Sequence, residues 1–107
     1  MKHRRPTNDE LVDLSWLLDS ALVVGDRGRA LDAATRLLES LLRHQERLTG
    51  APADGGSTTA ALRDACLSLT ASVATVVAGL NRGDKLKRVE FRHRVEALAT
   101  GRVQPAA

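Results

Sequence analysis

The chain has 107 residues, enough for one domain with its own hydrophobic core and too few for several. Its 16 lysines and arginines against 13 acids give a formal charge of +3, and its aromatic residues are Trp16 and Phe91. A single cysteine, Cys66, excludes an intramolecular disulfide and fits a reducing compartment. We therefore expect one cytoplasmic domain over residues 1–107, in which abundant Ala and Leu favour helix.

No secretory or membrane segment is expected. The basic N-terminus is followed by a stretch with four acids, where a signal peptide would have an apolar core. A long uncharged run, residues 65–80, has 16 residues and contains two serines and two threonines. This run is too short and too polar to be expected to span a bilayer.

The first half of the chain predicts two helices joined by a short link. Residues 7–24 begin with a capping-box spacing from Thr7 to Glu10, and Gly25 suits the left-handed residue that follows a helix. Asp26 then caps a second helix that continues to about residue 48. Both helices repeat apolar residues at helical spacing on one face. These residues are Leu11, Leu14, Leu18, Ala21 and Leu22 in the first helix, and Leu31, Ala34, Leu37, Leu38, Leu41, Leu42 and Leu48 in the second.

The second half predicts another helical pair after a Gly- and Pro-containing loop at residues 49–57, where we expect proteolytic nicking. A third helix runs to about residue 80, and small residues opposite its apolar stripe suggest a central position. A tight turn at residues 81–84 is followed by a fourth helix, capped by Asp84 and ending near Thr100, and residues 101–107 form a frayed tail. Two short links and one longer loop predict an all-α, four-helix bundle made of two antiparallel helical hairpins.

The predicted last helix is strongly basic. Between residues 82 and 94, six cations stand against two acids, a net charge of +4, whereas residues 7–24 carry four acids and no cation. On a helix, Lys85, Arg88 and Arg92 would form one ridge, with cations about 5–6 Å apart that could follow a phosphate backbone. The candidate nucleic-acid-binding residues are Arg82, Lys85, Lys87, Arg88, Arg92 and Arg94.

Two other readings of these charges stay open. They could be an ordinary solvated face, in which Arg92 and Glu96 form an i,i+4 ion pair. Alternatively, the acidic first helix and the basic last helix could neutralise each other, within one bundle or between copies.

Trp16 predicts a protein interface. On the first helix it aligns with Val12 and Val23, away from the leucine face, and a tryptophan flanked by valines is a common interface anchor. The alternative is that the last helix or the loop covers Trp16, because large aromatic side chains are mostly buried.

Nothing in the sequence predicts catalysis. His3, His44 and His93 lack metal-ligand spacing with one another or with Cys66, and no nucleophile, zinc or phosphate-loop motif is present. We therefore expect neither enzyme activity nor a metal or cofactor. The basic helix also has few Asn, Gln or Ser residues for base edges, so any nucleic acid should be bound through its backbone without sequence preference.

A short, cysteine-poor, all-helical protein with a basic face resembles the small helical subunit of CRISPR effector complexes. The resemblance implies a role in antiviral defence, in which several copies stack along the guide–target filament. Lys85, Lys87, Arg88, Arg92 and Arg94 would then contact RNA or single-stranded DNA non-specifically. We expect a non-catalytic subunit of a nucleoprotein assembly with protein and nucleic-acid partners. The alternative is a homo-oligomerising adaptor or regulator that contacts no nucleic acid.

Overall fold

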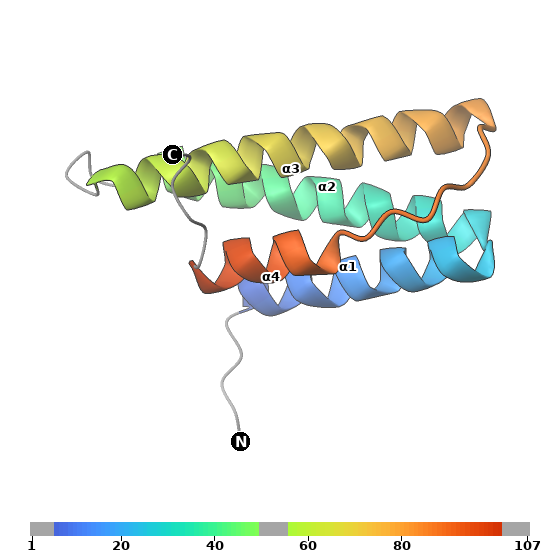
Figure 1. Cartoon of the computed structure of the whole chain (residues 1–107), viewed down its shortest axis with the longest axis horizontal. Helices are drawn as coiled ribbons and strands as arrows, with labels where there is room; N and C mark the ends of the chain where they lie inside the picture. Colours follow the sequence, from blue (N-terminus) through green and yellow to red (C-terminus); the bar gives the residue numbers. More distant parts are fainter. Residues whose placement is uncertain (1–5, 50–55, 102–107) are drawn as a thin grey trace, which may run out of the picture.

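The computed structural model describes residues 6–49 and 56–101. Within these ranges the regular secondary structure is entirely α-helix (Figure 1). The four helices are α1 (Pro6–Val24), α2 (Arg27–Thr49), α3 (Gly56–Arg82) and α4 (Arg92–Thr100). The predicted all-α class is therefore confirmed. Most of the predicted loop and nearly all of the predicted tail fall in residues 50–55 and 102–107, outside the described residues.

The first two helices end and begin where local signals place them. Gly25 has φ +79°, a left-handed conformation that glycine adopts without a steric penalty. The amide of Asp26 donates to the carbonyl of Ala21 at 2.9 Å, which closes α1. The Asp26 carboxylate accepts from the amide of Arg29 at 3.1 Å and so caps α2.

The third helix ends in the same way, but the chain does not re-enter a helix at once. Gly83 has φ +84°, and the amide of Asp84 donates to the carbonyl of Gly79 at 2.9 Å. Residues 84–91 are then non-helical, and α4 begins only at Arg92. The prediction of a helix beginning at Asp84 was wrong, and so was the tight turn expected to join the last two helices.

The core gathers residues from all four helices. α1 packs extensively on α2 and α2 on α3, whereas α4 lies along α1 and has few contacts with α3 (Figure 1). Three residues at i, i+4 and i+7 bring the last part of the chain into this core. These three residues are Phe91, Val95 and Leu98.

The small-residue side of α3 faces outward, contrary to the central position expected from the sequence. Ala60, Ser68, Ala71 and Ala78 on this helix are all exposed. The stretch from Ala60 to Arg82 has a mean hydropathy of 1.4 over its most apolar window and is long and apolar enough to cross a membrane. Core helices of soluble proteins also meet this criterion, so it is weak support for a membrane span.

Candidate nucleic-acid interface

The six candidate cations do not lie on one helical ridge. Arg82 ends α3, three cations stand on the non-helical segment 84–91, and Arg92 and Arg94 belong to the start of α4. The ridge of Lys85, Arg88 and Arg92 requires 3.6 residues per turn, and that geometry is absent between the first two of these residues. The expected match between a helical ridge and a phosphate backbone is therefore corrected.

The segment that carries three of these cations is attached to the bundle at both of its ends. At its start, the guanidinium of Arg27 donates to the carbonyls of Leu80 and Asp84. At its end, Phe91 is 1% exposed and packs in the core. Although the segment is irregular, these two anchors place its cations at a defined position, at the end of the molecule where α3 finishes.

Asp19, which no sequence motif marks as a functional residue, sets the start of α4. Its carboxylate is 6% exposed and accepts two hydrogen bonds from the amide of Phe91, at 2.9 and 3.1 Å, and one from the amide of Arg92, at 3.0 Å. These are amide groups that a helix N-terminus leaves without partners, and a negative charge is favourable there. Asp19 follows Ser15 and Leu11 at intervals of four, inside the buried stripe of α1. A buried carboxylate requires a hydrogen-bonding or charged partner, so the position of Asp19 in this apolar stripe was the sequence signal that could have identified it.

The basic residues differ in what they contact. Arg82 pairs with Asp84 at 2.9 Å, and Arg94 reaches from α4 to the hydroxyls of Ser68 and Ser72 on α3, each at 3.3 Å. Of the six candidate cations, three are exposed and have no ion pair or hydrogen bond through their side chains within the described residues. They are Lys85, Lys87 and Arg88, and they are the ones available to an external anion.

Trp16 lies between the two alternatives drawn from the sequence. It is 46% exposed, so it is neither a core residue nor a free surface side chain. Its indole N–H donates to Glu96 of α4 at 3.3 Å, and the guanidinium carbon of Arg92 lies 4.4 Å from its ring centroid. Helix α4 therefore covers part of Trp16.

The two valines expected beside Trp16 have different surroundings. Val12 is half-buried and packs against the core, whereas Val23 is 56% exposed. Val23 and Trp16 line one hollow of about 380 Å³, to which Arg88 also contributes. The structure thus places Trp16 and Val23 together next to a candidate cation, whereas Val12, one turn before Trp16, does not line this hollow.

The acids of α1 do not form a single negative face. Glu10 pairs with Arg43 of α2 at 3.3 Å, Asp13 is exposed, and Asp19 is buried against α4. Within the described residues, the neutralisation of the first helix by the last occurs at Asp19. Its partners there are backbone amides and not basic side chains.

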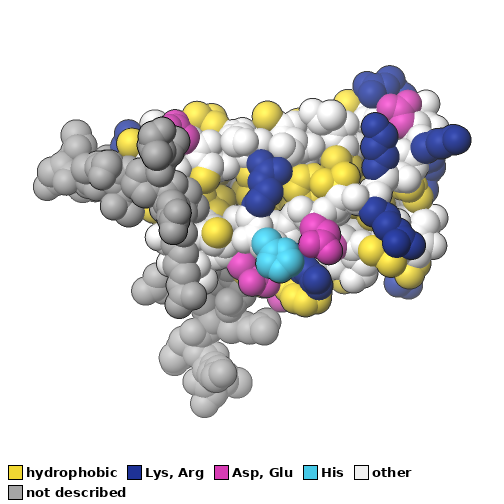
Figure 2. All heavy atoms as spheres, in the orientation of Figure 1, with side chains coloured by type: hydrophobic (Ala, Val, Ile, Leu, Met, Phe, Trp, Pro, Cys, Tyr) yellow, Lys and Arg dark blue, Asp and Glu magenta, His cyan; other side chains and the backbone are white. Residues whose placement is uncertain are grey.

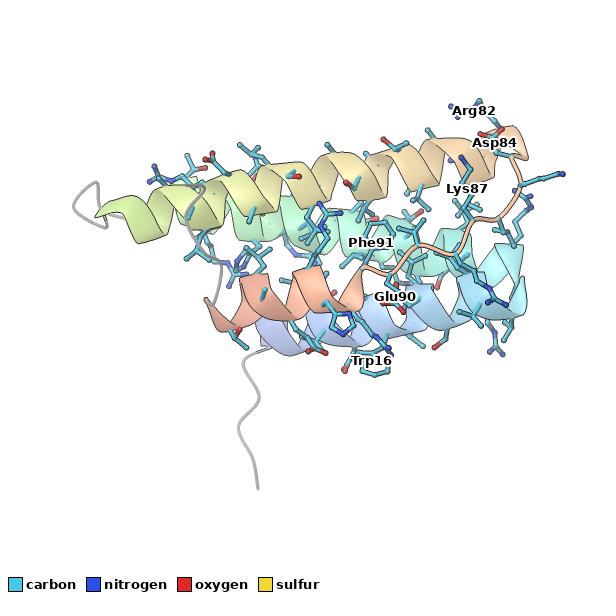
Figure 3. The ribbon with its side chains drawn as sticks, viewed as in Figure 1. Trp16, Arg82, Asp84, Lys87, Glu90 and Phe91 are labelled. Atoms are coloured by element: carbon cyan, nitrogen blue, oxygen red, sulfur yellow. The ribbon has the colours of Figure 1, made fainter. Side chains whose placement is uncertain are left out.

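A groove separates α3 from segment 84–91. It has a volume of about 430 Å³ and an apolar floor, with basic residues at its edges. Figure 2 shows this apolar strip running between α3 and the layer below it, with Lys and Arg side chains around it. In Figure 3, Lys87 extends from the segment toward α3, and Phe91 lies at the inner end of the segment.

Two further reactive side chains, Cys66 and His44, are wholly or partly buried in the bundle. Cys66 is fully buried, its S–H donates to the carbonyl of Leu41 at 3.6 Å, and burial raises the pKa of its thiol. His44 is half-buried, and desolvation, helped by the charge of Arg47, lowers its pKa. Among the described residues, no group of three or more His, Cys, Asp or Glu side chains is placed to hold a metal ion.

No protein-family model, curated protein or solved structure matches this chain. Its function is therefore argued from the arrangement of its own side chains.

Proposed function

We propose that this protein is a non-catalytic helical subunit of a cytoplasmic nucleoprotein assembly and that it binds the phosphate backbone of RNA or single-stranded DNA without sequence preference. The contact surface is the end of the molecule that carries Lys85, Lys87 and Arg88, flanked by Arg82. We also propose that the four helices act as one bundle of two hairpins, for which the short α1–α2 turn gives support.

The observation that carries this proposal is the placement of three unpaired, exposed cations on a segment held at both ends. Fixed cations lose less conformational entropy on binding than cations on a free loop. The remaining basic candidates contribute less, because Arg82 is paired with Asp84, and both Arg92 and Arg94 already contact other side chains. Phosphate is the expected target because lysine and arginine on an irregular segment offer charge and no arrangement for reading base edges.

A second candidate function is a protein-interaction adaptor. It is favoured by four large apolar side chains on α1 that remain exposed among the described residues, although α4 covers part of Trp16. These are Trp16, Leu17, Val23 and Val24. An adaptor of this kind would use α1 to contact a neighbouring protein or a second copy, and it would need no nucleic acid.

The test is a fluorescence-polarisation titration with two single-stranded oligonucleotides of unrelated sequence, at several salt concentrations. If about three phosphates are neutralised, the logarithm of affinity should fall against the logarithm of salt concentration with a slope of roughly −2. Changing Lys85, Lys87 and Arg88 to Gln should weaken binding to both oligonucleotides equally and bring the slope close to zero.

The matched control is Arg36→Gln with Arg47→Gln, which removes charge from the exposed side of α2. Arg47 lies 20 residues along α2 from Arg27, a distance of about 30 Å from the basic end. This variant should keep the slope of the parent protein. Absence of binding at low salt, or a preference for one oligonucleotide, would contradict the nucleoprotein reading and leave the adaptor.

A further inference from the structure

The groove between α3 and segment 84–91 combines two properties that a nucleic-acid backbone does not require together. Its walls are apolar and come from three parts of the chain. The residues are Leu22 of α1, Val76 and Leu80 of α3, and Leu86, Val89 and Phe91 of the segment. An apolar groove of about 430 Å³ lies within the size range of pockets that hold small molecules.

Charged side chains bound the groove along its length. At one end, Arg94 crosses from α4 to Ser68 and Ser72 on α3, and at the other end Arg82 pairs with Asp84. A helix of a partner protein is about 10 Å wide and several turns long, so it could not lie along the groove without breaking both contacts. A flexible chain of a few methylene groups fits between them.

The charged side chains at the rim of the groove indicate that the ligand is an anion. Four cations, Arg82, Lys85, Lys87 and Arg94, line the groove together with a single acid, Asp84, a net charge of +3. Lys85 and Lys87 have no side-chain partner among the described residues, and Lys87 extends over the groove toward α3 (Figure 3). An anionic head group at this rim would be charge-complementary, while its tail would cover the apolar walls.

We propose that this groove is a binding site for a single-chain anionic amphiphile, a long-chain carboxylate, whose tail lies on Val76, Leu86 and Val89 and whose head group meets Lys85 and Lys87. This proposal is independent of nucleic-acid binding, although the two ligands would share the lysines. An oligonucleotide needs the cations alone, whereas the carboxylate needs the apolar walls as well.

The test is calorimetric titration of the folded protein with dodecanoate below its micelle concentration. We expect saturable binding at one site. Octanoate should bind at least about tenfold more weakly, because four fewer methylene groups are removed from water. Dodecyltrimethylammonium, which has the same tail and the opposite charge, should not bind. Lys85→Gln with Lys87→Gln should weaken dodecanoate binding by about tenfold or more, and Arg47→Gln should have no effect.

Two further variants separate this site from the cation surface. Val76→Phe fills the groove and should abolish dodecanoate binding while leaving oligonucleotide binding unchanged. If Val76→Phe lowers the melting temperature, Val89→Asn provides the same test, because Val89 is partly exposed and an amide there removes apolar wall without changing the charge beside Arg88.

Three outcomes would overturn the proposal. One is the absence of saturable dodecanoate binding, and another is equal binding of the cationic amphiphile. The third is a concentration-dependent dimer, seen by sedimentation and abolished by Val76→Phe, in protein that does not bind dodecanoate, which would assign the groove to a second copy. Loss of oligonucleotide binding alone would contradict the proposed function and leave the amphiphile site intact.

Discussion

Phe91 and Trp16 are the aromatic side chains of the chain, and they stabilise the fold to different extents. Phe91 is fully enclosed, so Phe91→Ala should lower the free energy of unfolding by about 3–5 kcal/mol. Trp16 is 46% exposed and is held by one hydrogen bond and one cation–π contact, so Trp16→Ala should lower it by about 1–2 kcal/mol. Urea denaturation of both variants measures this difference. Equal losses would show that Trp16 is a core residue.

His44 predicts a dependence of stability on pH. Burial lowers its pKa in the folded protein below the unfolded value of 6.5, so the unfolded chain binds more protons at acid pH. The stability from the neutral side chain is fully present above pH 6.5. It is lost as the pH falls from 6.5 through the folded pKa.

The matched comparison is His44→Gln, which cannot titrate. Between pH 7.5 and 5, the free energy of unfolding of the parent protein should fall more than that of His44→Gln, as measured by denaturation at each pH. The same fall in both proteins would show that other groups control the acid sensitivity.

The Nδ1 atom of His44 and the Oγ atom of Ser40, one turn earlier on α2, are buried without hydrogen-bond partners within the described chain.

Helix α4 depends on a carboxylate that belongs to α1. It has nine residues, which is too short for independent stability in water, and its N-terminal amides are satisfied by Asp19. Asp19→Ala should therefore lower the free energy of unfolding by about 2 kcal/mol and speed hydrogen exchange of the Phe91 and Arg92 amides. Asp19→Asn should cost less, because the amide oxygen still accepts. The control is Asp32→Ala, which removes an exposed pair with Arg36 and should cost about 0.5 kcal/mol or less.

If Asp19→Ala leaves the exchange of the Phe91 and Arg92 amides unchanged, the start of α4 is determined by its own sequence and not by α1. The apolar residues of α4 would then be sufficient to dock it. This result would also weaken the argument that segment 84–91 is held at both ends.

At one end of the molecule, two hydrogen bonds from Arg27 connect the α1–α2 turn with the end of α3 and the start of segment 84–91. Arg27→Ala removes both hydrogen bonds and should increase trypsin cleavage after Lys85, Lys87 and Arg88 several-fold, as followed by mass spectrometry under native conditions. The control is Arg36→Ala on the exposed side of α2. Unchanged cleavage after Arg27→Ala would mean that Asp19 and Phe91 are sufficient to hold the segment.

Lys85 and Lys87 line the groove beside α3, whereas Arg88 shares a separate hollow with Trp16 and Val23 of α1. Lys87 lies near the end of α3, whereas Trp16 lies on the side of α1 that faces away from α3 (Figure 3).

Three of the four helices could be predicted because their limits depend on neighbours in the sequence. Gly25 and Asp26 act within a few residues of themselves, and apolar spacing places Leu11, Leu18 and Leu37 in the core. The fourth helix could not be placed in this way. Its start depends on Asp19, which is 72 residues away from Phe91 in the chain, and no local pattern reports such a contact.

The candidate site also has one part that the sequence predicts and one part that depends on contacts between distant segments. The basic character of residues 82–94 follows directly from the sequence. Which of them are available to a ligand depends on Asp84, Trp16, Ser68 and Ser72, which engage three of the cations. Helix periodicity depends on residues that are close in the sequence, so it can be predicted from the sequence alone. Side-chain pairing between distant segments depends on how the chain packs, so only the tertiary structure determines it.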